Sequence, residues 1–277
     1  MPEQDVAWIA TNRRPFSDFA VGSLVPVVFD GYARVLHPAW ARPGVPVRWE
    51  TVAKWAGRHM HSLAQWDFLF RPKAEPSDPT PFVAHPNPGG LPPGQLAALC
   101  DLLATHTSTP DLCFVGVWEG YAWLADSEWA ASPTLRLDER TFLVRQGPLG
   151  LALAVGRDAA NGGFVTEPPS VLWPADRAWF VASDPDLDST YLGGSNALIE
   201  AVLTHPDLEA WRATADDLVA IGSDEINYEI LPPWAGQTLS TIIRARVARV
   251  RLVPTEVVPS QSPSMPASQS PTSRGRA

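Results

Sequence analysis

The chain has 277 residues, a formal net charge of −9, 45% apolar residues and 18% charged residues. These values are typical of a globular protein that buries a sizeable core, in one large domain or two small ones. The sequence contains no apolar run of about 18 residues and no basic-then-apolar leader, so we expect a cytoplasmic protein. The acidic balance argues against a nucleic-acid partner, and the missing apolar run against a membrane partner.

Apolar patterning predicts an α+β fold with a mixed or largely antiparallel sheet and a few packed helices, because the predicted strands follow one another without regular βαβ alternation. Residues 1–20 are expected to be irregular, and the proline-rich residues 71–94 to form a long loop. Helices are predicted at 48–58, 93–105 and 196–204. Strands are predicted on both sides of a turn at Asp30-Gly31 within 24–36, and at 112–118, 120–124, 140–145, 149–155, 178–182 and 208–212.

We expect one domain over residues 15–252, with two sub-lobes divided in the 71–94 loop as the alternative. Residues 239–252 predict a basic amphipathic helix, with a strand as the alternative, and the Pro/Ser-rich residues 253–277 predict a disordered tail. The net charge is +5 over residues 240–277 and −14 over residues 1–239. The basic segment is therefore expected to fold back on the acidic part or to contact something else that is acidic.

The two cysteines, Cys100 and Cys113, are predicted to be reduced and buried, because each lies in an apolar run. His106 lies between them, but the spacing C-x5-H-x6-C matches no common zinc pattern. We therefore expect neither a metal nor a cofactor. The sequence also lacks the G-x-S-x-G, Walker A, G-x-G-x-x-G and H-E-x-x-H motifs, which lowers the expectation of an enzyme.

Three alternating carboxylates, Asp184, Asp186 and Asp188, follow an apolar run. Their spacing is similar to the first ligands of a calcium loop, but position 6 is a serine and position 12 is Ser195 rather than glutamate. An acidic strand-to-helix loop is the favoured interpretation. Ser195 is predicted to cap the following helix, with an anion site at Gly193-Gly194-Ser195 as the weaker alternative.

A second cluster, Trp118, Glu119 and Tyr121, is predicted near a strand turn. Its role is either structural only or that of a surface for a small ligand or peptide. Arg177 lies between two tryptophans in sequence and could stack on an indole ring. His59 and His61 share a face only in a strand and are expected to be exposed loop residues.

Residues 106–124 (HTSTPDLCFVGVWEGYAWL) and 172–204 resemble segments of actinobacterial proteins to which no activity is assigned. The resemblance implies a source class that suits the preference of this chain for arginine over lysine. Gly90-Leu91-Pro92-Pro93 before a helix, in an acidic Trp-rich chain, is similar in style to SUKH-type immunity proteins, and this likeness transfers no residue.

The leading hypothesis is a cytoplasmic, non-catalytic binding protein that recognises another protein. The alternative is a hydrolase that uses the 184–195 acidic loop with His106 or His59, and a deep pocket joining 106–121 with 184–195 would favour it. The candidate binding residues are Trp118, Glu119, Tyr121, Arg177, Asp184, Asp186, Asp188 and Ser195.

Overall fold

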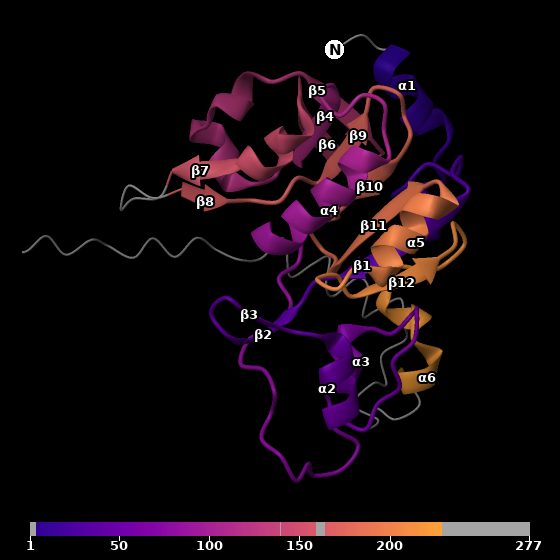
Figure 1. Ribbon diagram of the computed structural model, residues 1–277, viewed down its shortest axis with the longest axis vertical. Coiled ribbons are helices and arrows are strands. Elements are labelled where there is room, and N and C mark those ends of the chain that lie inside the picture. Colours follow the sequence, from indigo (N-terminus) through magenta and orange to yellow (C-terminus); the bar gives the residue numbers. More distant parts are fainter. Residues whose placement is uncertain (1–3, 139, 159–163, 229–277) are drawn as a thin grey trace, which may run out of the picture. The chain divides into compact units, whose positions relative to one another are not determined.

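An eight-stranded antiparallel sheet is the centre of the computed structural model, which describes residues 4–138, 140–158 and 164–228 (Figure 1). Its order is β12 (Ala210–Ala213), β1 (Gly31–Leu36), β11 (Ser189–Gly194), β10 (Phe180–Ala182), β9 (Val171–Pro174), β4 (Cys113–Trp118), β6 (Arg140–Gly147) and β5 (Thr134–Leu137). Every neighbouring pair is antiparallel. The expected α+β class with a largely antiparallel sheet is confirmed.

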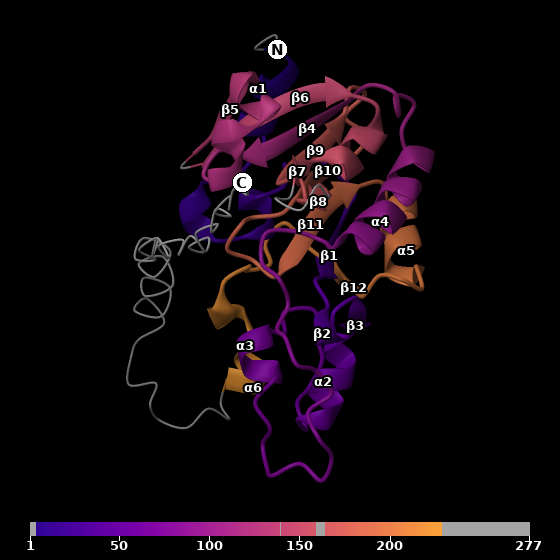
Figure 2. The ribbon, with the colours of Figure 1, turned by 90° about the vertical axis from the view of Figure 1, so that its left-hand side faces the viewer.

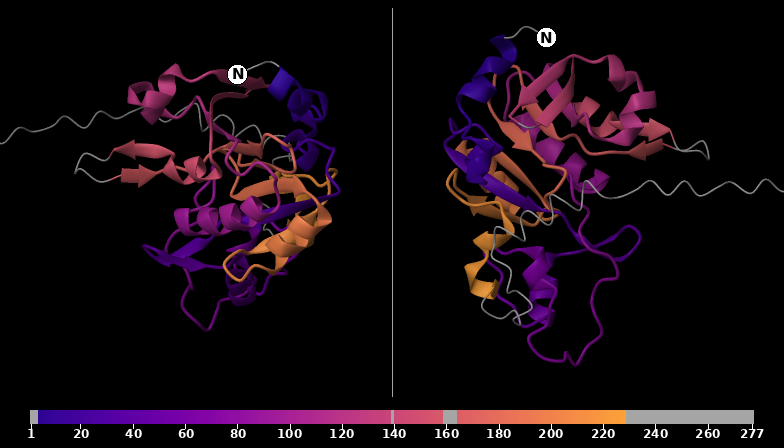
Figure 3. Two further views of the ribbon diagram at one scale, coloured as in Figure 1. Left: turned by 45° about the horizontal axis from the view of Figure 1, so that its top comes forward. Right: turned by 180° about the vertical axis from the view of Figure 1, so that it is seen from behind.

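Two helices, α4 (Pro93–Thr105) and α5 (Asn196–Thr204), cover one face of the sheet and lie side by side (Figures 2 and 3). Leu96, Leu99 and Leu103 recur at helical spacing in α4, and all three are buried against the sheet. Burying one such side chain stabilises the fold by roughly 1.5–3 kcal/mol. Both helices were predicted, and the buried apolar stripe is what their periodicity encodes.

The N-terminal segment covers the opposite face, through α1 (Gln4–Thr11), η1 (Phe16–Asp18) and η2 (Val21–Ser23). Beneath it three rings stack along the sheet, with centroids 5.1 Å apart for Phe114 and Trp173 and 5.7 Å apart for Trp173 and Phe180. The prediction that residues 1–20 are irregular was wrong for α1, where the fully buried Ile9 docks the helix on this core.

A third cluster of buried residues includes Trp49, Trp66 and Phe82 and lies mainly in β2 (Ala39–Arg42), β3 (Val45–Val47), α2 (Trp49–Trp55) and α3 (Trp66–Leu69). Glu209, which immediately precedes β12, accepts hydrogen bonds from the amides of Trp49 (2.6 Å) and Glu50 (2.8 Å) and so caps α2. The short helix α6 (Glu225–Tyr228) touches α3. The predicted helix at 48–58 is confirmed as α2, and the loop predicted over 71–94 is confirmed as far as Pro92, where α4 follows.

Several predicted strands were wrong. Residues 120–124 lie largely in the 3-10 helix η3 (Ala122–Asp126) and residues 149–155 in η5 (Leu149–Ala154), where Pro148 sets an extended entry to the helix. Residues 24–30, predicted to include a strand, form turns and bends directly after η2. These runs are apolar because they pack on the core, and burial alone does not distinguish a strand from a 3-10 turn.

The opposite error occurred at 183–194, predicted as a loop, which contains the fully buried β11. Its glycines permit close packing, because a Cβ on Gly193 would lie 2.4 Å from the Phe29 ring and a Cβ on Gly194 would lie 2.7 Å from Leu198. The hairpin of β7 (Gly156–Asp158) and β8 (Phe164–Thr166), the 3-10 helices η4 (Glu128–Ala131) and η6 (Ile221–Ser223), and strands β2, β3, β5 and β9 were also not predicted.

All described residues belong to a compact unit that spans residues 1–236. The predicted basic segment at 239–252 and the predicted tail at 253–277 lie outside the described residues. No described helix is both long and apolar enough to cross a membrane. Cys100 and Cys113 are free and buried, as predicted, and burial raises their pKa values to about 12 and about 11.

His37 joins three segments inside the fold. Its Nδ1 lies 2.8 Å from the Asn87 carbonyl oxygen, which can only accept, so Nδ1 carries the proton and donates. Its Nε2 then accepts from the Thr190 hydroxyl at 2.9 Å, and Ser183 lies 2.7 Å from the same hydroxyl. Burial is the main cause that lowers the pKa of His37 to about 4, and the positive charge of Arg34 lowers it further.

Acid should destabilise the fold through His37. The unfolded chain binds a proton at this histidine below its ordinary pKa of about 6.5, while the folded chain stays neutral down to about 4. Stability from this group is therefore complete above about pH 6.5, and about 3 kcal/mol of it is lost as the pH falls through 4. Denaturant unfolding of wild type and His37→Gln at a series of pH values checks this. Equal pH slopes for the two proteins would contradict it.

Candidate functional site

The acidic loop meets a cation that the sequence did not reveal. Arg140, at the start of β6, binds Asp184 at 3.1 Å and Asp186 at 2.6 Å, and its guanidinium lies 5.0 Å from the centroid of the Trp118 ring. The Tyr121 ring packs edge-on against Trp118, with centroids 5.3 Å apart. Four of the candidate residues are thus brought together, and Arg140 is the group that joins them.

The carboxylates of this cluster bind groups of the protein itself, and little space is left beside them. The Asp184 side chain is 8% exposed, and burial raises its pKa while Arg140 and the Asp186 amide act in the opposite direction. Beside it lies a cavity of about 20 Å³, room for about one water molecule. A cavity of this size is too small to hold a substrate.

Asp188 does not join Asp184 and Asp186 as the third ligand of a calcium loop. Its carbonyl oxygen accepts the His37 amide at 3.0 Å, at the start of β11. Across the described residues no three His, Cys, Asp or Glu side chains form a group that could hold a metal ion. The acidic loop is bound by arginine and by its own backbone.

The remaining candidate residues lie apart from this cluster. Ser195 caps α5, as predicted, by accepting the Leu198 amide at 3.3 Å. Glu119 is exposed, and its amide binds the Thr141 carbonyl at 2.9 Å. Arg177 stacks over Trp8, 5.4 Å from the ring centroid, rather than over the tryptophans adjacent in sequence.

The histidines of the hydrolase alternative do not bind the acidic loop. His106 ends α4 as its C-cap residue. His59 is exposed, as predicted, and its amide is 3.1 Å from the Asn227 side chain. His61 is partly buried and binds the fully buried Asp224 at 2.8 Å, so the prediction of an exposed loop residue was wrong for His61. Asp224 also accepts the Gln65 and Asn227 amides, so it holds α6 against the start of α3.

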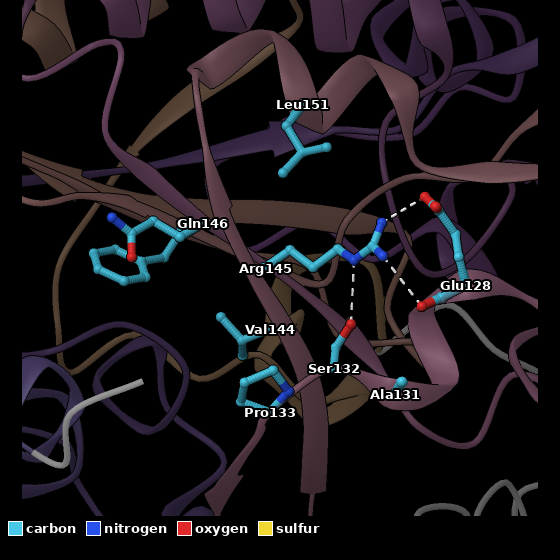
Figure 4. Close-up of a pocket in the computed structure, with 9 residues that line it drawn as sticks. Glu128, Ala131, Ser132, Pro133, Val144, Arg145, Gln146 and Leu151 are labelled. Atoms are coloured by element: carbon cyan, nitrogen blue, oxygen red, sulfur yellow. Dashed lines mark hydrogen bonds and ion pairs between the residues drawn. The ribbon is translucent and has the colours of Figure 1, made fainter.

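A groove of about 480 Å³ lies at the edge of β6 and contains none of the predicted residues (Figure 4). It is lined by Phe114, Glu128, Ala131, Ser132, Pro133, Val144, Arg145, Gln146 and Leu151. Phe114 and Val144 belong to the core on one face of the sheet. Arg145 stacks on Trp129 from the core of the other face, 4.9 Å from the ring centroid. Because side chains of both faces line it, the groove lies in the plane of the sheet.

The groove occupies the place of a missing strand. β5 pairs with Arg140–Leu143 only, after which the Val144 amide binds the Pro133 carbonyl at 2.8 Å. Successive residues of a strand face alternate sides, so the amide and carbonyl of Gln146 face the same way as those of Val144. They point past the end of β5, where no described strand pairs with them, and Gln146 is exposed.

Arg145 is held rigidly in the wall of the groove. Its guanidinium binds the Glu128 carboxylate and, at 3.1 Å, the Glu128 carbonyl, and its Nε lies 3.2 Å from the Ser132 hydroxyl (Figure 4). One sequence signal for the groove existed. Pro133 immediately precedes β5, and a proline cannot donate to a neighbouring strand, so pairing stops there.

Comparisons of this chain with protein-family models, with curated proteins and with solved structures find no match.

Replacing Arg140 tests the role of the acidic cluster. Arg140→Leu leaves the buried Asp184 carboxylate without its cation, and should lower the free energy of unfolding by about 3 kcal/mol. Adding Asp184→Asn removes the stranded charge and should recover part of that loss. Denaturant unfolding of the single and double variants measures both. A rise in melting temperature of wild type with millimolar calcium would instead favour the cation-loop interpretation.

Proposed function

We propose that this protein is a non-catalytic binding protein that recognises another protein through the groove at the edge of β6. The observation that carries the proposal is the unpaired stretch of β6 opening into a groove of about 480 Å³ lined by apolar and polar side chains. Concave surfaces of this kind are typical of recognition sites.

The other features of the chain agree with this role. Asp184 and Asp186 already bind Arg140, which leaves the hydrolase alternative with less support. Two free buried thiols suit the reducing cytoplasm, where we place the protein. The net charge of −14 over residues 1–239 would repel nucleic acid and favours a partner that is neutral or basic.

A groove-filling variant tests the proposal. Ala131 is exposed and lines the groove, so Ala131→Trp should fill it without removing an internal hydrogen bond. Ala130→Trp is the matched control, because Ala130 is equally exposed and does not line the groove. Each protein is used to capture partners from a native lysate, with quantitative mass spectrometry as the readout.

We expect a stoichiometric partner that Ala131→Trp loses by at least about tenfold, which corresponds to about 1.4 kcal/mol, while Ala130→Trp keeps it. If no stoichiometric partner is captured, or if Ala131→Trp retains it as well as wild type does, this protein does not recognise a partner through the groove.

A further inference from the structure

We propose that the partner enters the groove as an extended peptide segment and adds a strand to β6 through main-chain hydrogen bonds. This inference rests on the proposed function and specifies how recognition takes place. The segment that binds is short, with alternating apolar side chains and no net negative charge.

The main chain of β6 sets the binding mode. Beyond its pairing with β5, β6 presents the Val144 carbonyl and the Gln146 amide and carbonyl at the open edge. These groups alternate in the pattern that an added strand requires. Pro148 ends the edge because it has no amide hydrogen. Because Pro133 lies opposite Val144, the three residues 145–147 remain for pairing; they extend for about 10 Å and so pair with about three residues of a peptide.

The groove walls set the side chains that fit. Successive side chains of an added strand point to opposite faces. On one face they meet the apolar Phe114 and Val144, and on the other face they meet Leu151 and the aliphatic part of Arg145. Apolar side chains are thus favoured on the first face, while the main-chain bonds impose no sequence of their own.

Charge favours a neutral or basic peptide over the acidic residues 1–239 of a second copy. In the groove the charges of Arg145 and Glu128 neutralise each other. The remaining field is that of residues 1–239, with a net charge of −14. Two such bodies repel each other, whereas a neutral or basic segment is attracted.

Among the described strands, β6 is open at its outer side only beyond its pairing with β5. Sheet edges are normally covered or broken so that they do not pair with foreign strands. Here β5 covers the first half of β6, and residues 128–133 line the groove beyond it. These residues border the free groups of β6, so the segment that reaches them must be narrow.

A proline substitution at Gln146 tests this mode of binding. The Gln146 amide faces the open edge and not β4, so Gln146→Pro removes the proposed donor while the internal ladder stays intact. Gln146→Ala is the matched control, because it removes the side chain and keeps the amide. The probe is a set of fluorescent peptides selected on the full chain from a random library of segments of about ten residues, longer than the open edge.

In fluorescence anisotropy, Gln146→Pro should weaken peptide binding at least tenfold, and Gln146→Ala should change it less than twofold. N-methylation of the peptide, one amide at a time, should abolish binding at alternate positions only, because only every second amide faces β6. This scan uses the wild-type protein, so it decides the question even if Gln146→Pro fails to fold.

The outcomes separate this inference from the proposed function. If Ala131→Trp abolishes peptide binding while Gln146→Pro does not, or if N-methylation has the same effect at every position, recognition stands and strand addition is wrong. If the library yields no binder, strand addition by a peptide is overturned. If sedimentation shows a dimer that Gln146→Pro disrupts, the occupant is a second copy and the proposed foreign peptide is wrong.

Discussion

Burial of both faces of one antiparallel sheet is the constraint on which the rest of this structure depends. Every residue of β1, β9, β10 and β11 is buried, so these strands have no solvent-exposed face. One face requires the helical layer of α4 and α5, and the other requires the N-terminal segment. A polar side chain buried here needs a partner inside the protein, and His37 finds two, Asn87 and Thr190.

The same constraint explains which elements could be predicted from the sequence. Helices α4 and α5 each have one apolar stripe and a proline or serine at the N-terminus. These signals can be recognised in the local sequence without knowledge of the neighbouring elements. Strand β11 carries no such signal. Ser189, Gly193 and Gly194 are poor indicators of a strand. They lie in one because they pair with β1, and a larger side chain at either glycine would collide with its neighbours.

The same holds for the two sites: single residues could be recognised in the sequence, but contacts between distant residues could not. The sequence placed Trp118 and Asp184 among the candidates, but their connection depends on Arg140, which lies more than twenty residues from either. The groove was missed for a related reason. It exists because β5 is shorter than β6, and strand length relative to a neighbour is a property of pairing, which no single segment encodes.

The pairing of β1 has a consequence for how the chain folds during synthesis. Its two neighbours, β11 and β12, lie within residues 189–213, and the cap of α2 is supplied by Glu209. A nascent chain that has left the ribosome up to residue 180 therefore holds a strand without neighbours and a helix without its cap. Domains with such distant contacts fold slowly, and exposed strands tend to aggregate in the meantime. The pairing of β1 and the capping of α2 are therefore completed only after residue 213 has emerged.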